Sequence, residues 1–350
     1  MSKSQRLPLW NAIYSLEKQA ILDGHYSVGG LFCTIDSLAA KHGVSAITAR
    51  RVLSLLAEDG LVRNIRHKGS IVIRRERERR FFLIMPNEAT SITQRTIHVT
   101  HHLMKGVYDG ARLHKMDIQL ANEDFLSVPE SKGEAFVCLY SYLRCSMEHL
   151  AALSLTRKIV LLHPPHAYSG IFTTRCDLAA GIGFSVARAA LKGHTRIAFL
   201  GPDPKSMWFQ QRYLGYVNKL TELNLELNVE MVGFLSVINF SEEEIEEAMS
   251  RILSIKNPPT AVCCTDDRAA LGVLKYCQRH RISVPRRLAI IGFDNRHEAS
   301  LSRPRLSTID AQLSACGRLA VETLNRLIDG ETAIKRDQVI QPVFIPGETL

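Results

Sequence analysis

Four apolar runs in this sequence each lead into a short polar segment: "IMPNEA", "FLGPDPKSMW", "CTDDRA" and "GFDNRH". These segments bring together carboxylates, amides and one indole ring, contributed by Asn87, Asp203, Trp208, Asp266, Asp267, Asp294 and Asn295. Hydrogen-bonding groups beside an aromatic platform suit a polyhydroxylated or otherwise polar small ligand. The competing interpretation is that Asp and Asn only cap the helices that follow, a role we expect of Asp267. Four such segments favour a ligand site and leave the capping interpretation open.

For these segments to meet, the apolar runs must be neighbouring strands. From Phe81 onward, short runs rich in Val, Ile and Leu alternate with helical patterns, which indicates parallel sheets covered on both faces. About 270 residues are enough for two such sheets. The expected strands are "FFLIM", "DIQLA", "AFVCL", "KIVLLH", "RIAFLG", "VEMVGFL", "TAVCCT", "LAIIGF" and "PVFIP", and the expected helices span 177–192, 206–223, 241–255, 267–281 and 313–329. Ligands bind beyond the carboxyl ends of such strands, which is where the polar segments lie.

Positive charge near the start of the chain indicates a second kind of chemistry. Residues 1–80 hold 14 Lys+Arg and 7 Asp+Glu, so they carry a net +7 of the total +9. Residues 81–350 carry the remaining +2 and resemble an ordinary near-neutral domain in composition. A compact basic module points to a polyanionic partner.

The basic module has the pattern of a helix-turn-helix. Apolar residues at helical spacing predict a first helix over 8–24. In "TIDSLAAKHGVSAITARRVLSLLAEDGLV", Thr34 can cap a short helix through Lys41, and Gly43 permits a left-handed turn. Ser45 can then cap a second helix that runs to about Asp59. The N-terminal residues of the second helix in such a pair read base edges in the major groove.

The segment after the second helix, "LVRNIRHKGSIVI", reads as strand, basic turn and strand, which is the pattern of a wing. The glycine at its tip lets the backbone approach a phosphate closely. Double-stranded DNA is therefore the expected partner. The residues that we expect to contact it are Thr34, Ser45, Thr48, Arg50, Arg51, Arg66, His67, Lys68 and Gly69.

The charge run "RRERERR", residues 74–80, directly precedes the apolar strand that begins at Phe81. Charges of alternating sign stay solvated and resist apolar collapse, so we interpret this run as a joint between domains. The expected organisation is a DNA-binding domain over 1–73, a charged linker over 74–80 and an effector-binding and dimerisation domain over 81–350.

Residues 7–73 resemble the winged-helix domain of the gluconate-repressor (GntR) family, through "LAAKHGVSAITARRVLSLLAEDGLV" and "HKGSIVI". The resemblance implies a transcription regulator. Members of that family often carry arginine where Asp36 and Ala46 stand in this chain. The operator sequence therefore does not transfer from the family, and Thr48, Arg50 and the wing are the better candidates for DNA contact.

Most of residues 81–350 look like the effector domain of the lactose-repressor family, whose fold is similar to type I periplasmic sugar-binding proteins. The similarity lies in "GHTRIAFLGP", "RYLGYVNKL", "PTAVCCTDDRAALGVLKYCQRHRISVPRRLAIIGFDN" and "SRPRLSTIDAQLSACGRLAVETLNRLIDG". It implies a two-lobed α/β domain with parallel sheets. Arg212 and Asp294 match ligand-holding positions, Asp266 stands where the family commonly has asparagine, and Asp177 matches a hinge-side aspartate. The expected ligand-binding residues are Asn87, Trp208, Arg212, Asp266 and Asp294.

Patterns typical of enzymes and metal sites are weak. "GPDPKS" has Pro204 where a phosphate-binding loop needs its second glycine, and no G-x-S-x-G occurs. "HVTHH" and "HPPH" have no acidic or cysteine partner at ligand spacing, so we expect no metal and no cofactor. The eight irregularly spaced cysteines are expected to be reduced core thiols. With no run approaching 18 apolar residues and no signal-peptide pattern, we expect a cytoplasmic protein without a membrane segment.

The sequence therefore predicts a ligand-responsive transcription regulator, most simply a repressor, that senses a sugar or a similar polar small molecule. A single wing reads only one half-site, so we expect a homodimer on a two-fold related operator. Two alternatives stay open: a solute-binding receptor or transport protein, and a DNA-binding regulator with no small-molecule response.

Overall fold

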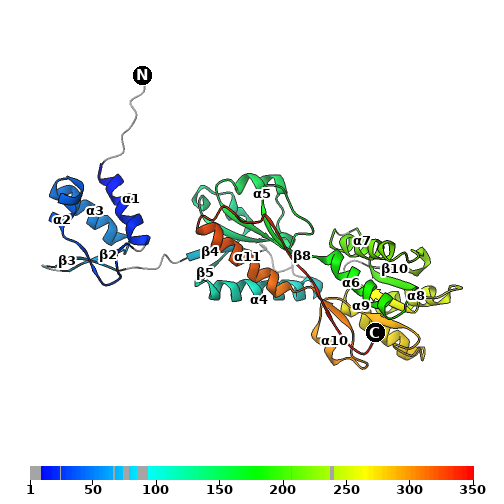
Figure 1. Ribbon diagram of the computed structural model, residues 1–350. Coiled ribbons are helices and arrows are strands. Elements are labelled where there is room, and N and C mark those ends of the chain that lie inside the picture. Colours follow the sequence, from blue (N-terminus) through cyan, green and yellow to red (C-terminus); the bar gives the residue numbers. More distant parts are fainter. Residues whose placement is uncertain are drawn as a thin grey trace, which may run out of the picture. The chain divides into compact units, whose positions relative to one another are not determined.

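The protein was analysed as a computed structural model, which describes residues 9–23, 25–65, 68–73, 79–85, 94–205, 207–236 and 240–350. The chain separates into two compact units, Met1–Arg79 and Arg80–Leu350. Figure 1 shows the helices and strands of each unit. Among the helices of the described residues, none is both long and apolar enough to cross a membrane.

The first unit packs three helices against a small sheet. The helices are α1 (Leu9–Leu22), α2 (Ile35–His42) and α3 (Ala46–Glu58). The strands are β1 (Leu31–Cys33), β2 (Val62–Ile65) and β3 (Gly69–Val72), in the order β1-β3-β2 with antiparallel pairing. Strands β2 and β3 form the wing. The predicted helix-turn-helix and wing are confirmed, and β1 was not predicted.

Local sequence explains where α2 and α3 begin and end. The Thr34 hydroxyl accepts a hydrogen bond from the Ser37 backbone N–H at 3.1 Å and so caps α2. Gly43 ends that helix in the left-handed conformation with φ 63°. Ser45 caps α3 in the same way through the Thr48 N–H at 3.3 Å. The apolar face of α3 is buried in the core, through Ala49, Val52, Leu53 and Leu56.

The second unit has two lobes. The first lobe is built on a six-stranded sheet in the order β14-β8-β7-β6-β4-β5. Pairing from β14 through β8, β7 and β6 to β4 is parallel throughout. The elements of this lobe are β4 (Arg79–Ile84), α4 (Gln94–Leu113), β5 (Met116–Ala121), β6 (Ala135–Leu139), α5 (Met147–Leu153), β7 (Lys158–Leu162), β8 (Phe172–Cys176), α11 (Leu313–Ile328) and β14 (Asp337–Ile340), with 3-10 turns η2 (Glu123–Leu126), η3 (Pro129–Ser131) and η4 (Tyr140–Tyr142).

The second lobe is built on a four-stranded parallel sheet in the order β10-β9-β11-β12. A short antiparallel pair, β13 with β15, completes it. The elements of this lobe are α6 (Leu178–Leu191), β9 (Ile197–Pro202), α7 (Met207–Glu222), η5 (Val229–Met231), β10 (Val232–Leu235), α8 (Glu242–Ser254), β11 (Ala261–Cys264), α9 (Asp267–Arg279), β12 (Ala289–Ile291), α10 (His297–Leu301), β13 (Thr308–Asp310) and β15 (Val343–Ile345).

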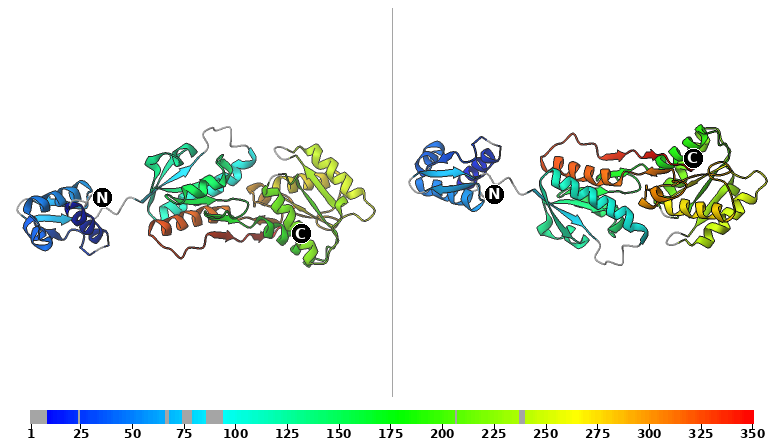
Figure 2. Two further views of the ribbon diagram at one scale, coloured as in Figure 1. Left: turned by 90° about the horizontal axis from the view of Figure 1, so that it is seen from above. Right: turned by 90° about the horizontal axis from the view of Figure 1, so that it is seen from below.

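The chain passes repeatedly between the lobes, as the views in Figure 2 show. It leaves the first lobe at the end of β8, returns between β13 and α11, and leaves again between β14 and β15. One cluster of buried apolar side chains runs through both lobes, from Phe81 and Val160 to Phe199 and Phe293. The lobes are therefore joined by core packing as well as by the connecting segments.

The expected strands and helices of this unit are confirmed, apart from small shifts at their ends, and the two-lobed parallel α/β fold is confirmed with them. Several elements were not predicted. The longest described helix, α4, was missed, as were β8, β13 and β14. Strand β8 reads "FTTRC" and lacks an apolar run, although Thr173 and Thr174 are buried in the sheet.

Helices α4 and α11 lie side by side and approach at backbone distance (Figure 1). A Cβ atom on Gly106 would lie 2.0 Å from the Ser314 carbonyl oxygen. One on Gly317 would lie 2.1 Å from the Leu103 carbonyl oxygen. Because glycine has no side chain, the backbones of the two helices pack directly against each other over the sheet. The Ser314 hydroxyl strengthens this contact by donating to the His102 carbonyl at 3.0 Å.

We predict that Gly317→Ala destabilises the protein by about 1–3 kcal/mol, because the added methyl group forces the two backbones apart. This loss opposes the gain of about 1 kcal/mol that alanine brings to a helix interior. Urea unfolding followed by circular dichroism measures the change in the free energy of unfolding.

Gly183→Ala in α6 is the matched control. Its new methyl group would lie 3.3 Å from the flexible Lys219 side-chain carbon, which can move. This variant should be as stable as the wild type or more stable by up to about 1 kcal/mol. Equal effects of the two substitutions would contradict the backbone-contact argument.

Candidate functional site

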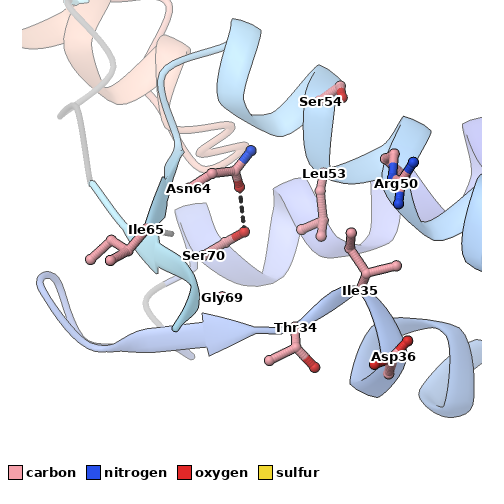
Figure 3. Close-up of a pocket in the computed structure, with 10 residues that line it drawn as sticks. All are labelled: Thr34, Ile35, Asp36, Arg50, Leu53, Ser54, Asn64, Ile65, Gly69 and Ser70. Atoms are coloured by element: carbon pink, nitrogen blue, oxygen red, sulfur yellow. Dashed lines mark hydrogen bonds between the residues drawn. The ribbon is translucent and has the colours of Figure 1, made fainter. Parts of the chain in front are cut away.

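A hollow on the first unit lies between α3 and the wing (Figure 3). Four elements supply its walls: the N-terminus of α2, one face of α3, and strands β2 and β3. The lining residues are Thr34, Ile35, Asp36, Arg50, Leu53, Ser54, Asn64, Ile65, Gly69 and Ser70. The Ser70 hydroxyl donates to Asn64 Oδ1 at 2.6 Å and holds the wing strands together at the floor. The structure thus brings Thr34, Arg50 and Gly69 to one surface.

The first turns of α3 present a mixed surface to solvent. Ser45 and Arg50 are exposed, and Thr48 is half-buried with its hydroxyl 3.0 Å from that of Ser45. Sequence reasoning missed Ile47, whose side chain is 81% exposed on the same helix. An apolar side chain so exposed at the start of a helix has no packing role within the described unit. Helical spacing places Ile47 opposite the buried positions of α3, and this pattern in the sequence could have identified it as an exposed contact residue.

Two of the expected contact residues have structural roles. The Arg51 guanidinium lies over the Trp10 ring of α1, 4.3 Å from the ring centroid. Gly69 has φ 95°, and a Cβ there would lie 2.9 Å from the Cys33 carbonyl oxygen. The glycine is therefore needed to pack the wing against β1. Lys68 is exposed at the wing turn, while Arg66 and His67 lie outside the described residues.

A buried carboxylate fixes α1 against α2. Glu17 is 1% exposed and is surrounded by Lys41 Nζ at 2.6 Å, His42 Nε2 at 2.5 Å and the Tyr26 hydroxyl at 3.0 Å. Burial by itself would raise the pKa of Glu17. The hydrogen bonds from Lys41, His42 and Tyr26 outweigh it and hold the pKa below the ordinary value of 4.5. Glu17 is thus charged near neutral pH and ties down the helix that precedes α3.

The second unit brings Arg212 and Asp294 together at the carboxyl ends of its second sheet. Arg212 Nη2 donates to Asp294 Oδ1 at 3.0 Å, and Nη1 donates to the Thr265 carbonyl. Both side chains are less than 10% exposed, and the guanidinium lies 4.2 Å from the Phe293 ring centroid. Arg212 Nε is buried and has no hydrogen-bond partner among the described residues. The pair is thus a salt bridge between α7 and the loop after β12, and it leaves one donor of Arg212 unsatisfied.

Aromatic side chains from both lobes meet beside this pair. Trp208, one helical turn before Arg212 on α7, packs edge-on against Tyr140 of the first lobe with ring centroids 5.3 Å apart. Tyr140 stacks on Tyr168, whose hydroxyl donates to that of Tyr140 at 2.9 Å. The Trp208 indole N–H is buried without a partner among the described residues. Sequence reasoning missed both tyrosines, although Tyr140 directly follows the predicted strand "AFVCL".

The aspartates after β11 have different roles from those expected. The expectation that Asp267 caps the following helix is wrong, because Asp266 is the cap and accepts from the Ala269 N–H at 2.8 Å. Asp267 is buried and accepts from the Thr308 hydroxyl at 2.5 Å and the Arg296 N–H at 2.6 Å. Burial raises the pKa of Asp267 to about 8, against the lowering effect of those hydrogen bonds. Asp267 thus ties the loop after β12 to β13.

The other polar residues of the predicted site divide between capping and local contacts. Asp177 caps α6 by accepting from the Ala180 N–H at 2.9 Å. Asp203 pairs with the neighbouring Lys205, and Asn295 donates to Asp310 at 3.2 Å. Asn87 lies outside the described residues. The capping interpretation therefore holds for Asp266, and Asp177, expected as a hinge-side aspartate, is a cap as well. Arg212, Asp294 and Trp208 are brought together.

Comparison with known proteins agrees with the division of the chain into two units. Residues 9–72 match the family model described as bacterial regulatory proteins, gntR family. Residues 186–350 match the model described as a periplasmic binding protein-like domain.

Curated relatives match over part of the chain. The HTH-type transcriptional repressor PurR of Histophilus somni is 31% identical over 211 residues, covering 58% of this chain and 59% of the relative. The ribose operon repressor of Haemophilus influenzae is 30% identical over 169 residues, covering 48% of this chain and 50% of the relative. The chain spans about half the length of the curated relatives it matches.

Solved structures show the same fold. The Escherichia coli transcriptional repressor ascG has a TM-score of 0.64 at 18% identity, with 78% of this chain and 99% of that chain covered. A LacI family regulator from Enterococcus faecium with bound ribose has a TM-score of 0.59 at 19% identity, with 77% and 98% covered.

Fold and comparisons together define a chain of two modules, a helix-turn-helix domain and a two-lobed α/β domain. More particularly, a gntR-type domain precedes a periplasmic-binding-protein-like domain, and the curated relatives of the chain include the PurR and ribose operon repressors.

We predict that Glu17→Gln weakens the first unit by about 1.5–3 kcal/mol at pH 7, because hydrogen bonds to a charged group are lost. The pKa of Glu17 is lower in the folded state than the ordinary value of 4.5. Its contribution is therefore present above pH 4.5 and is lost as the pH falls through the folded-state value. Urea unfolding followed by Trp10 fluorescence, in a Trp208→Phe background, measures the difference between variant and wild type across this range.

Glu58→Gln is the control, since Glu58 is an exposed carboxylate at the end of α3. It should leave the stability unchanged at every pH. A Glu17→Gln deficit that persists unchanged well below pH 4.5 would show that the carboxylate charge is not what stabilises this packing.

Proposed function

We propose that the protein is a ligand-responsive DNA-binding transcription regulator, acting as a repressor like its named relatives. The observation that carries the proposal is the hollow between α3 and the wing, with Arg50 exposed on its wall. It lies on a basic domain that matches the gntR family. The N-terminus of a helix, where the dipole is positive, beside a basic wing is a surface that complements a DNA backbone.

In this proposal the N-terminal half of α3 enters the major groove. Arg50 reads a guanine edge, Thr48 accepts or donates at a base, and Ile47 contacts a thymine methyl group. Lys68 contacts a phosphate from the wing, together with Arg66 and His67. Thr34 and Ser45 orient the two helix ends, and Arg51, held on Trp10, contributes charge near the backbone.

The proposed effector is a sugar or another polar small molecule, bound where the two lobes meet. Arg212 offers a planar set of donors and Asp294 offers acceptors, which suits adjacent hydroxyl groups. Trp208 with Tyr140 offers the apolar face that a sugar ring needs. Asn87 and Asp266 stay in the proposed ligand set. Since Trp208 and Tyr140 come from different lobes, a ligand that contacts both rings favours one lobe arrangement over others and so shifts the affinity for DNA.

The remaining features of the proposal follow from this mechanism. Residues 74–80 join the DNA-binding domain, 1–73, to the effector domain, 81–350. The effector domains hold a homodimer on a two-fold related operator. Catalysis has no place in the mechanism, nor does a membrane, and the protein acts in the cytoplasm. A solute-binding role is disfavoured by the basic domain, and a regulator without small-molecule response remains the alternative that the effector experiment decides.

We predict that Arg50→Ala lowers affinity for the selected operator by about 1–3 kcal/mol and changes the preferred sequence, because a base contact is lost. Lys68→Ala should weaken binding to all sequences alike and reduce the salt slope by about 1, because a phosphate contact is lost. Operators are first selected from a random duplex library with the full chain. Gel-shift titrations at several salt concentrations then measure affinity and slope.

Arg279→Ala is the control, because Arg279 is an exposed arginine of the effector domain. The substitution removes one positive charge at a position far along the chain from the proposed DNA-binding residues. It should leave both quantities unchanged. Wild-type affinity in both the Arg50 and Lys68 variants would place the DNA-binding surface elsewhere.

We predict that one member of a panel of mono- and disaccharides binds the wild type, and that Arg212→Lys and Asp294→Asn each weaken it about 10-fold or more. A charge-assisted hydrogen bond is worth about 1.5–3 kcal/mol, which corresponds to this loss. Isothermal titration measures the affinity, and Trp208 emission in a Trp10→Phe background reports contact with the ring.

Arg175→Lys is the matched control, because Arg175 forms another salt bridge in this unit, with Asp337 at 2.8 Å. It should bind the sugar as the wild type does. If a sugar binds and neither the Arg212 nor the Asp294 variant weakens it, the pocket is wrongly assigned. If the protein binds its operator and no sugar of the panel changes the affinity, the alternative of a DNA-binding regulator without small-molecule response would be favoured.

A further inference from the structure

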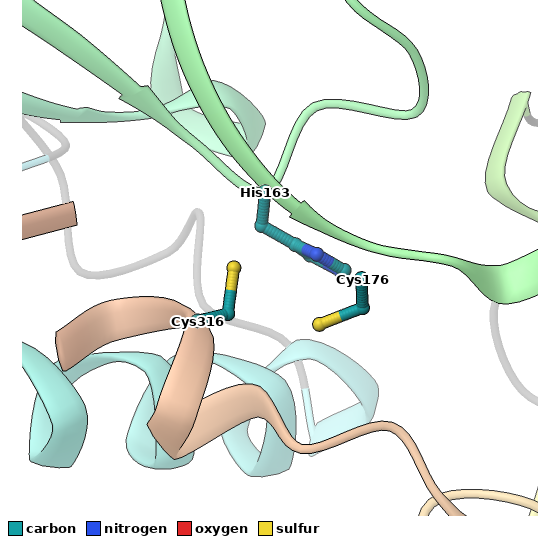
Figure 4. A group of neighbouring side chains, drawn as sticks. All are labelled: His163, Cys176 and Cys316. Carbon is teal, nitrogen blue, oxygen red and sulfur yellow. The ribbon is translucent and has the colours of Figure 1, made fainter. Parts of the chain in front are cut away.

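A buried cluster of His163, Cys176 and Cys316 takes no part in the proposed DNA or sugar contacts (Figure 4). His163 follows β7, Cys176 ends β8, and Cys316 lies in the first turn of α11. Figure 4 shows the imidazole and both sulfur atoms converging between the sheet and α11. One nitrogen of His163 and the two sulfur atoms all lie within 4.8 Å of one another.

The cluster is sealed from solvent. His163 is 5% exposed, Cys176 is 3% exposed and Cys316 is fully buried. Aliphatic side chains could fill this part of the core, and they have no polar atoms that need hydrogen-bond partners. The chain instead places two thiols and an imidazole in contact.

The histidine is held there at a cost. Its Nδ1 is buried and has no hydrogen-bond partner among the described residues. A buried polar atom that has no hydrogen-bond partner destabilises the folded state. The His163 backbone is also in the left-handed region, at φ 57°, while its N–H donates to the Thr174 carbonyl at 2.7 Å. A ligand that accepts the free lone pair of the imidazole would remove the unsatisfied group.

The chemistry of the donor set selects the ligand. Thiolate sulfur and imidazole nitrogen bind soft and borderline d10 cations, and hard ions such as Mg²⁺ and Ca²⁺ prefer oxygen. Sulfur bonds of about 2.3 Å and nitrogen bonds of about 2.0 Å place ligand atoms within the spacing seen here. Two thiolates and a neutral imidazole give a neutral complex with Zn²⁺ and an anionic one with Cu⁺, and burial disfavours net charge.

We propose that His163, Cys176 and Cys316 form a binding site for a thiophilic d10 cation, and that Zn²⁺ is the ion that fits it best. Binding replaces the two thiol protons, which pass to solvent, by two metal–sulfur bonds. The Thr174 hydroxyl, buried in the sheet and within hydrogen-bonding reach of Cys316, is a candidate for the fourth position of a tetrahedral ion.

The position of the site gives the ion a mechanical role. Cys176 stands directly before Asp177, where the chain leaves the first lobe, and Cys316 lies just after the chain returns to it. A bound ion would therefore link the two segments on which movement between the lobes depends. This inference does not rest on the proposed DNA or sugar binding.

The test uses the full chain, purified with a chelator and a thiol reductant and then titrated with Co²⁺ as a spectroscopic substitute for Zn²⁺. We expect a saturable sulfur-to-cobalt charge-transfer band with the visible bands of a tetrahedral ion, and its displacement by Zn²⁺. Cys176→Ser, Cys316→Ser and His163→Gln should each weaken binding by at least about 100-fold, which exceeds the effect of losing an outer-shell partner.

Cys138→Ser is the control, because Cys138 is buried in β6 of the same sheet and lies outside the cluster. It should keep the wild-type cobalt spectrum. Thermal unfolding of the wild type with and without Zn²⁺ gives a second readout that needs no variant, and the metal should raise the midpoint.

Three results would overturn the proposal. The first is a reduced wild type that gives no cobalt band and no stabilisation by Zn²⁺. The second is tight Cu⁺ binding at these residues without Co²⁺ or Zn²⁺ binding, which would overturn the choice of ion. The third is a disulfide between Cys176 and Cys316 in the isolated protein, found by mass spectrometry, with no metal binding after its reduction.

Discussion

The contact between the backbones of α4 and α11 is the constraint on which the second unit depends. Gly106 and Gly317 leave no side chain between the two helices, so the distance between them is set by backbone atoms and cannot relax. Helix α11 is the element with which the chain returns to the first lobe, and it covers β6, β7 and β8. Fixing α11 therefore fixes the returning segment, the cover of the sheet and the depth at which Cys316 enters the core.

In the first unit the corresponding constraint is electrostatic. The basic residues of this unit would repel one another on so small a domain, yet Lys41 forms an ion pair with a single buried carboxylate, Glu17, which His42 also contacts. Lys18 is likewise paired with Asp59 at the end of α3. Two lysines are thus paired where helices pack, while Arg50 and Lys68 are exposed. Such pairing allows a small domain to carry a net positive charge and still pack its helices.

Prediction from sequence succeeded where local chemistry decides the structure. Thr34, Gly43 and Ser45 marked the helix ends correctly, and the aliphatic runs marked the parallel strands. It failed at β8, where Thr173 is satisfied by Asp337, a residue of β14 far along the chain. Helix α4 was missed because glycines that serve a helix contact weaken its helical pattern. The hydrogen-bonding of Asp266 and Asp267, the pairing of Tyr140 with Trp208, and the cluster of His163 with two distant cysteines all depend on tertiary contacts.

The chain forms most of the second lobe before it returns to complete the first, and this order has a consequence for synthesis on the ribosome. The sheet surface formed by β6, β7 and β8 emerges first, but α11 and β14 follow only after residues 177–312 have been made. At the usual rates of translation this delay is on the order of ten seconds. During that time an apolar sheet face lacks its cover and β8 lacks its neighbour β14. The first lobe is thus begun before the second and finished after it, and chaperones that shield nascent chains have a defined surface to protect.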